Sequence, residues 1–166
     1  MRPLEIGRGT DQYAAGSHRA HIALNELNLP FEEEIIDLSV PRTPEYLKIN
    51  PRGVLPSLEY NGEIITDSAI VVQFLADAHP SHLLLASNSD GAALHRARIN
   101  FFVDAYCTKA VPVYFKALSA KTPDEAEAFA TDFVDVVAKE VENLLANAAP
   151  YFGGSNTLTL AEVCLS

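Results

Sequence analysis

The first eighty residues carry short apolar segments with two different periods, which predict strands and helices in turn. Leu4–Ile6 predicts a short strand, followed by a loop of small and polar residues. From Ser17 the apolar residues recur every three or four positions, which predicts a helix that ends before Pro30. Phe31–Leu38 predicts a second strand, and one helical turn is expected over 45–49.

A hairpin is the clearest local signal in the chain. The strand-like segments Leu55–Tyr60 and Glu63–Thr66 are separated by Asn61-Gly62, a pair that suits a two-residue turn with positive φ at both positions. Asp67-Ser68 then suits the start of a helix that Pro80 ends, since a capping side chain and a negative charge are both favourable there.

Beyond residue 90 the apolar pattern is helical throughout. One long periodic stretch carries Phe101 and Phe102, with a kink expected at Pro112. Thr122-Pro123 predicts the start of another helix, which is expected to turn apolar side chains toward a core until Gly153-Gly154. The predicted core side chains of that helix are Phe129, Phe133, Val136, Val137, Val141, Leu144 and Leu145.

The order of elements predicts a small mixed α/β unit (βαβ, then ββα) followed by an all-helical unit. We expect the first domain over residues 1–80, a linker over 81–90 and the helical domain over 91–166.

Composition narrows the class of protein. The net charge of −10 argues against nucleic acid and anionic membrane as partners, since both require clustered Lys and Arg. Two cysteines, Cys107 and Cys164, are too few for a disulfide framework, and no signal peptide precedes the first strand; a cytoplasmic protein is expected. His18 and His21 have no third ligand at a suitable spacing, so we expect no metal site.

Several motifs together resemble the glutathione transferase family. The run Asn50-Pro-Arg-Gly-Val-Leu-Pro56 and the later Asp67-Ser-Ala-Ile70 are similar to its glutathione-binding signature, and His18–Leu24 is similar to its first helix. The resemblance continues to Thr159–Glu162, which matches a capping box that starts a core helix. It implies a thioredoxin-like first domain, a helical second domain, and glutathione as co-substrate.

The resemblance also implies roles for individual residues. Pro56 would follow a cis peptide bond, and the backbone of Leu55 would pair with the cysteinyl unit of glutathione. Asp67 would accept from the γ-glutamyl ammonium, while Ser68 and the helix start would bind its carboxylate. The structural alternatives are that Pro56 merely begins an edge strand and that Asp67 is an ordinary helix cap.

Two positions depart from the family pattern. Val54 stands where the family often has the lysine that binds the glycyl carboxylate of glutathione, so Arg52, Arg42 and Lys48 are the candidate cations.

The second departure is at the catalytic position. Counting back five residues from Arg19 reaches Ala14, whose side chain has no group that could stabilise a thiolate. Tyr13 and Ser17 flank that position and are the candidate catalytic residues; the alternative for Ser17 is that it caps its helix.

Two functions remain open from the sequence. One is conjugation of the glutathione thiol to a small electrophile, a detoxification reaction, with Phe102 and Tyr106 as candidate lining residues or ordinary core. The other is binding of glutathione or assembly without turnover, which Ala14 favours. A homodimer is expected as in the family, and the helical domain is expected to be incomplete because its central helix has only about two turns before Ser166.

Overall fold

The computed structural model describes residues 4–9, 15–37 and 39–166. The chain divides into two compact units, Met1–Leu84 together with Ser166, and Leu85–Leu165. The division falls inside the segment that the sequence predicts as a linker.

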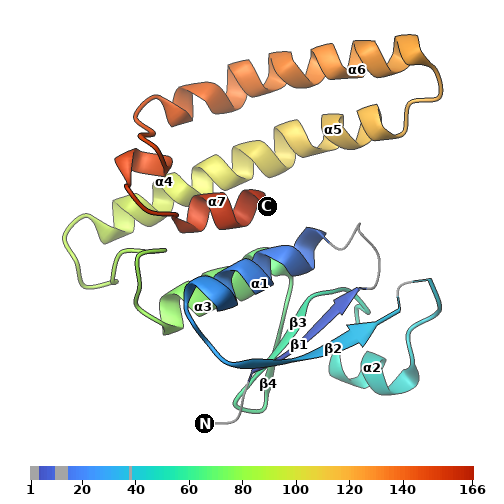
Figure 1. Cartoon of the computed structure of the whole chain (residues 1–166), viewed down its shortest axis with the longest axis vertical. Helices are drawn as coiled ribbons and strands as arrows, with labels where there is room; N and C mark the ends of the chain where they lie inside the picture. Colours follow the sequence, from blue (N-terminus) through green and yellow to red (C-terminus); the bar gives the residue numbers. More distant parts are fainter. Residues whose placement is uncertain (1–3, 10–14, 38) are drawn as a thin grey trace. The chain divides into compact units, whose positions relative to one another are not determined.

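The first unit is built on a mixed sheet with the strand order β2-β1-β3-β4 among the described residues (Figure 1). Its strands are β1 (Leu4–Gly9), β2 (Phe31–Ile36), β3 (Ser57–Tyr60) and β4 (Glu63–Thr66). β1 runs parallel to β2 and antiparallel to β3, and β3 runs antiparallel to β4. β1 continues past the predicted Leu4–Ile6, because Gly7–Gly9 pair with β2 although they lack a strand-like apolar pattern.

Three helices accompany this sheet: α1 (Ala15–Glu26), α2 (Pro44–Ile49) and α3 (Ser68–Ala78). Figure 1 shows α1 and α3 side by side over the sheet. α1 begins before Ser17, so the interpretation of Ser17 as the cap of its helix is wrong: it lies within the first turn. The hairpin turn is confirmed, with φ of 53° at Asn61 and 87° at Gly62.

Buried apolar side chains join these helices to the sheet. Leu58 on β3 is fully buried, as are apolar residues on the facing sides of both long helices. Those residues are Ala20, Ala23, Leu24, Val71, Val72 and Leu75. This is the thioredoxin-like arrangement that the resemblance implies.

The second unit is helical. Its elements are α4 (Ala92–Ala105), the π-helical turn η1 (Tyr106–Ala110), α5 (Val111–Leu118), α6 (Pro123–Val136), η2 (Val137–Val141), η3 (Glu142–Leu145), η4 (Phe152–Gly154) and α7 (Leu160–Leu165). In Figure 1 α4 and α5 follow each other along one rod, α6 returns beside it, and α7 lies against α4.

The interruption predicted at Pro112 is a π-helical turn directly before it. Proline lacks an N–H and its ring collides with the carbonyl four residues earlier, and a wider turn relieves both problems. The predicted helix start at Thr122 is confirmed, because its hydroxyl accepts from the Glu125 N–H at 3.2 Å.

The core of this unit gathers Ile99, Phe102, Val141, Phe152, Leu160 and Val163. Of the core predicted for the helix after Thr122, Val141 is buried, whereas Leu145 is 37% exposed and that part of the prediction is wrong. The helix passes from α to π to 3₁₀ geometry over this stretch, which turns its later residues away from the face that a regular helix would present.

Candidate ligand-binding site

The site begins at one end of the β3–β4 hairpin. Ser57, the first residue of β3, pairs with Thr66, the last residue of β4. Pro56 and Asp67, the next residue outward on each side, therefore leave the hairpin at the same end. The pairing brings the two predicted binding segments, Leu55-Pro56 and Asp67-Ser68, next to each other.

The first segment presents a free peptide edge. The Leu55–Pro56 bond is cis, as the resemblance implies. Within the part of the chain that the structure describes, neither the N–H nor the C=O of Leu55 makes a hydrogen bond. Pro56 is buried while Leu55 is half-buried. An extended peptide could pair with this edge as a further strand does.

A cluster of buried polar side chains, Tyr46, Asn50 and Ser57, holds this segment in place. The Tyr46 hydroxyl donates to the Val54 carbonyl at 2.8 Å, and the Asn50 amide donates to the same oxygen at 2.6 Å. Both side chains also contact the Ser57 hydroxyl, at 2.9 Å and 3.1 Å. Asn50 is 1% exposed, Ser57 6% and Tyr46 7%, so these bonds are shielded from water.

The second segment is the start of α3. Asp67 caps the helix, its Oδ1 accepting from the N–H groups of Ala69 at 3.0 Å and Ile70 at 3.5 Å. Its backbone has φ of +78°, a conformation that non-glycine residues rarely adopt. Such conformations concentrate at binding sites. The cap that the sequence predicts is confirmed, and Asp67 Oδ2 has no partner among the described residues.

Arg19 adds a positive charge at this helix start. Its Nη1 donates to the Ser68 hydroxyl at 3.3 Å, although the two residues are 49 positions apart. The Ser68 N–H makes no hydrogen bond to another described residue. A guanidinium, a free N–H and the positive end of the helix dipole together favour an anionic group here.

The candidate cations for the far end of the ligand differ in availability. Arg42 is engaged with backbone carbonyls: Nε donates to Gly53 at 3.1 Å, and Nη1 donates to Asp37 and Val40, each at 3.0 Å. The Arg52 side chain is exposed and makes no polar contact with another described residue, and Lys48 is also exposed.

Of the two candidate catalytic residues, Tyr13 and Ser17, the structure describes Ser17. Tyr13 and the counted position Ala14 lie outside the described residues. Ser17 is 1% exposed, and its hydroxyl has no hydrogen-bond partner among the described residues. Its side chain lies in the interior of the first unit rather than at the surface.

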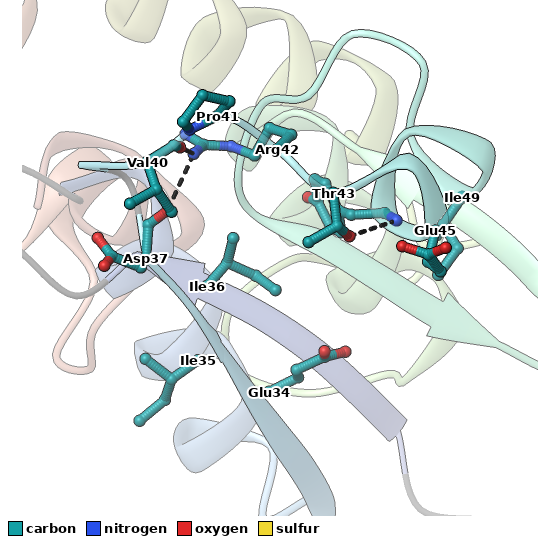
Figure 2. A pocket seen from close by; sticks show the side chains of 11 residues that line it. Glu34, Ile35, Ile36, Asp37, Val40, Pro41, Arg42, Thr43, Glu45 and Ile49 are labelled. Atoms are coloured by element: carbon teal, nitrogen blue, oxygen red, sulfur yellow. Dashed lines mark hydrogen bonds between the residues drawn. The ribbon is translucent and has the colours of Figure 1, made fainter.

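A cavity of about 310 Å³ lies between the end of β2 and α2 (Figure 2). Figure 2 shows the Arg42 guanidinium at its rim, bonded to backbone carbonyls. The carboxylates of Glu34, Asp37 and Glu45 line the same cavity. Three acidic side chains beside a guanidinium that is already engaged disfavour an anionic ligand there.

The helical unit has a groove of about 480 Å³ between α4 and η3, whose lining includes Arg98, Phe101 and Asn143. His95 also lines it; burial, together with the charges of Arg96 and Arg98, lowers the pKa of its imidazole below 6.5. Of the two lining residues that the sequence predicts, Phe102 and Tyr106, Phe102 is 2% exposed and stacks on Phe152 with ring centroids 4.8 Å apart. The alternative for Phe102, core packing, is confirmed; Tyr106 is half-buried.

Metal-ligand clusters and membrane-spanning helices are both absent from the described residues. No cluster of three or more His, Cys, Asp or Glu side chains there could hold a metal ion. His21 instead contacts Glu33, with its Nε2 2.6 Å from the carboxylate. The helices of those ranges are too short or too polar to span a bilayer.

Sequence reasoning missed Tyr46 and used Arg19 only as a reference point for counting. Both act on residues distant along the chain, Tyr46 on Val54 and Ser57, and Arg19 on Ser68. No local pattern marks such contacts. The nearest signal was the tyrosine itself, which lies in the predicted helical turn before Asn50.

Comparisons with known proteins agree with this geometry. Residues 15–78 match the model of the glutathione S-transferase N-terminal domain. Glutathione S-transferase GST-4.5 of Xanthomonas campestris is 33% identical over 102 residues, covering 61% of this chain and 48% of that protein. A glutathione S-transferase of Triticum aestivum is 27% identical over 158 residues, covering 90% of this chain and 70% of that protein. The chain thus spans about half the length of the first relative.

Solved structures extend the similarity over both units. Glutathione transferase Omega 3C from Trametes versicolor superposes with a TM-score of 0.80 at 23% identity, covering 99% of this chain and 71% of that one. Rice GST1 in complex with glutathione superposes with a TM-score of 0.79 at 25% identity, covering 99% of this chain and 73% of that one.

A thioredoxin-like unit with a free peptide edge beside a helix start, followed by a helical unit, is the arrangement of a glutathione transferase fold. Residues 15–78 carry the glutathione S-transferase N-terminal domain, and the rest of the chain is similar to glutathione transferases in fold.

Proposed function

We propose that this protein binds glutathione along the hairpin end and joins its thiol to a small electrophile. The observation that carries the proposal is the adjacency of the free Leu55 peptide edge to the start of α3, where Arg19 supports Ser68. Glutathione is a tripeptide whose γ-glutamyl end carries both a carboxylate and an ammonium. Its backbone needs peptide groups to pair with, its carboxylate needs an anion site, and its ammonium needs an acidic side chain beside that site.

The ligand would lie as follows. The γ-glutamyl carboxylate would accept from the Ser68 hydroxyl and N–H, and its ammonium would contact the free oxygen of Asp67. The cysteinyl unit would exchange two hydrogen bonds with the backbone of Leu55. Of the candidate cations for the glycyl carboxylate, Arg52 is better supported than Arg42, whose guanidinium already holds backbone carbonyls.

The chemistry requires the thiolate of glutathione. A free thiol has a pKa of about 8.5, so only a small fraction is ionised at neutral pH. Free N–H groups at the start of α1 would stabilise the thiolate. Tyr13 and Ser17 are the proposed hydroxyl donors, although the burial of Ser17 supports it less. With a chloroarene, a carbon–sulfur bond forms as the carbon–chlorine bond breaks, releasing chloride and the thiol proton.

The test separates binding from turnover. Calorimetric titration with glutathione measures binding, and absorbance with 1-chloro-2,4-dinitrobenzene measures conjugation. Loss of turnover in Tyr13→Phe or Ser17→Ala, with binding retained, would identify the donor. Absence of glutathione binding would overturn the proposal.

A second function, glutathione binding without transferase turnover, is favoured by Ala14 at the position five residues before Arg19. It predicts calorimetric binding with no conjugation of the chloroarene. Isomerisation is a third activity to assay, since relatives named maleylacetoacetate isomerase occur in Aspergillus fumigatus and Rhizobium meliloti.

We further propose a cytoplasmic homodimer. The groove of the helical unit is bordered by Phe101, which is 62% exposed, and Leu94 on the same helix is 56% exposed. A second copy would remove this apolar surface from water. The chain has two cysteines, Cys107 and Cys164, too few for a disulfide framework, which fits a reducing compartment. A monomer by light scattering, with both units folded, would contradict the dimer.

A further inference from the structure

The Val54 carbonyl oxygen is held by two buried donors, the Tyr46 hydroxyl at 2.8 Å and the Asn50 amide at 2.6 Å. A carbonyl oxygen has two lone pairs, so both acceptor positions are used. The Val54–Leu55 peptide plane is therefore held from the side of α2.

The orientation of the next N–H follows from that plane. The Val54–Leu55 bond is not one of the cis bonds. In a planar trans peptide the C=O and the following N–H point in opposite directions. Because the Val54 carbonyl points into the buried cluster, the Leu55 N–H points away from it, toward the side where it has no partner among the described residues.

The protons in the cluster can be assigned. The Val54 carbonyl can only accept, so the single proton of the Tyr46 hydroxyl goes to it. The Ser57 hydroxyl, 2.9 Å from the Tyr46 oxygen, must then donate to it, and it accepts from the Asn50 amide at 3.1 Å. The Asn50 carbonyl oxygen accepts from the Arg52 N–H at 3.1 Å. Every polar atom of the Asn50 side chain is thus satisfied.

We infer that Tyr46 is a positioning residue for ligand binding: its hydroxyl, with the Asn50 amide, aims the Leu55 N–H at the ligand's cysteinyl carbonyl. A phenylalanine would fill the same volume without holding the carbonyl. This inference rests on the proposed function, since it assumes that the Leu55 edge pairs with glutathione.

The test compares three conservative variants by calorimetry with glutathione. Tyr46→Phe should weaken binding about tenfold, as expected when one buried hydrogen bond that orders a binding group is lost. Ser57→Ala removes a hydroxyl of the same buried cluster but leaves both donors on the Val54 carbonyl, so it should weaken binding less than Tyr46→Phe does. Tyr60→Phe is the control for loss of a tyrosine hydroxyl, since that hydroxyl has no partner among the described residues.

A modified ligand distinguishes positioning from general loosening. In the trans-alkene isostere of the Cys–Gly amide, the carbonyl that would accept from Leu55 is absent. Wild type and Tyr46→Phe should bind this isostere with equal affinity. An equal loss for both ligands in Tyr46→Phe, an unchanged affinity for glutathione, or a loss in Ser57→Ala as large as that in Tyr46→Phe would overturn the inference.

A measurement without ligand keeps the result separate from that of the proposed function. In the free protein the Val54 carbonyl ¹³C resonance should move upfield in Tyr46→Phe and stay in place in Tyr60→Phe. If wild type fails to bind glutathione, the proposed function is wrong, and this resonance still reports whether Tyr46 holds the peptide plane. An unmoved resonance refutes the inference on its own.

Discussion

The guanidinium of Arg19 lies 3.3 Å from the Ser68 hydroxyl and joins α1 to the first residue of α3. Arginine has no acceptor, so it donates, and the Ser68 proton remains free to donate elsewhere. The contact therefore leaves Ser68 as a donor at a helix start that already favours anions.

Arg19→Met should weaken glutathione binding by roughly tenfold to a hundredfold, the effect of losing a charge-assisted bond and a nearby positive charge. The measurement is calorimetric titration. The peptide 4-aminobutanoyl-Cys-Gly lacks the γ-glutamyl carboxylate, and its affinity should be the same for wild type and variant. A loss shared by both ligands would show that Arg19 acts on the fold and not on the anion site.

Asp67 has two proposed roles: its side chain caps α3, and its negative charge attracts the ligand's ammonium. Two variants separate these roles. Asp67→Asn keeps an oxygen that can cap α3, so its free energy of unfolding should change by less than about 1 kcal/mol. It should nonetheless bind glutathione more weakly, because a neutral amide attracts the ammonium less. Asp67→Ala loses the cap at a residue with φ of +78° and should cost about 1–3 kcal/mol in urea unfolding. Equal stability of the two variants would contradict the capping role.

Gly53 and Gly62 provide a matched pair of left-handed glycines. Both have positive φ, 62° and 87°, so alanine at either position costs about 1–2 kcal/mol in backbone energy. At Gly53 the added Cβ would also lie 3.2 Å from Arg42 Cγ and 3.3 Å from Leu47 Cδ2, whereas at Gly62 it would meet nothing within 4 Å. Thermal unfolding should therefore show Gly53→Ala as the less stable variant; the reverse order would mean that the Arg42 side chain moves freely.

Glu162 stabilises the start of α7. Its carboxylate accepts from the N–H groups of Phe152 at 2.8 Å and Thr159 at 2.9 Å, and Ala161 N–H donates to the Thr159 hydroxyl at 3.2 Å. The capping box implied by the resemblance is thus confirmed. Glu162→Ala should lower the free energy of unfolding by about 1–3 kcal/mol, because partly buried N–H groups lose their acceptor. Glu142→Ala, at an exposed position of the same unit, is the control and should change little.

His95 should make stability depend on pH in mildly acidic solution. Burial lowers its pKa in the folded protein below 6.5, so below that pH the unfolded chain binds the proton more readily. The contribution is fully present above pH 6.5 and is lost as the pH falls toward the lower folded pKa. Urea unfolding at pH 5 and pH 7.5 should show this difference in wild type and a smaller one in His95→Leu. An equal difference in both proteins would assign the dependence to other groups.

Local patterns predicted the elements whose cause is local. The hairpin turn needed residues that tolerate positive φ, and Asn61-Gly62 supplies them. The starts of the helices at Asp67 and Thr122 needed a side-chain acceptor, and both make the expected bonds. The resemblance added the cis bond before Pro56, which no local pattern would have distinguished from an ordinary edge proline.

Other features depended on partners far along the chain. β1 extends to Gly9 because β2 offers pairing groups, not because its residues have strand character. Leu145 leaves the predicted core because the helix changes its pitch before it. The candidate cations for the glycyl carboxylate could not be ranked from the sequence. Only the fold shows that the Arg42 guanidinium donates to backbone carbonyls.

Local sequence was enough to predict the succession of strands and helices, the turn and cap residues, and the two segments that carry the glutathione signature, because these depend on neighbours within a few positions. Tertiary structure alone decided that those segments leave the same end of one hairpin, that Arg19 supports Ser68, and that Tyr46 holds the peptide before Leu55. Such contacts join residues separated by eight to forty-nine positions, and their energies arise only after the chain has folded back on itself.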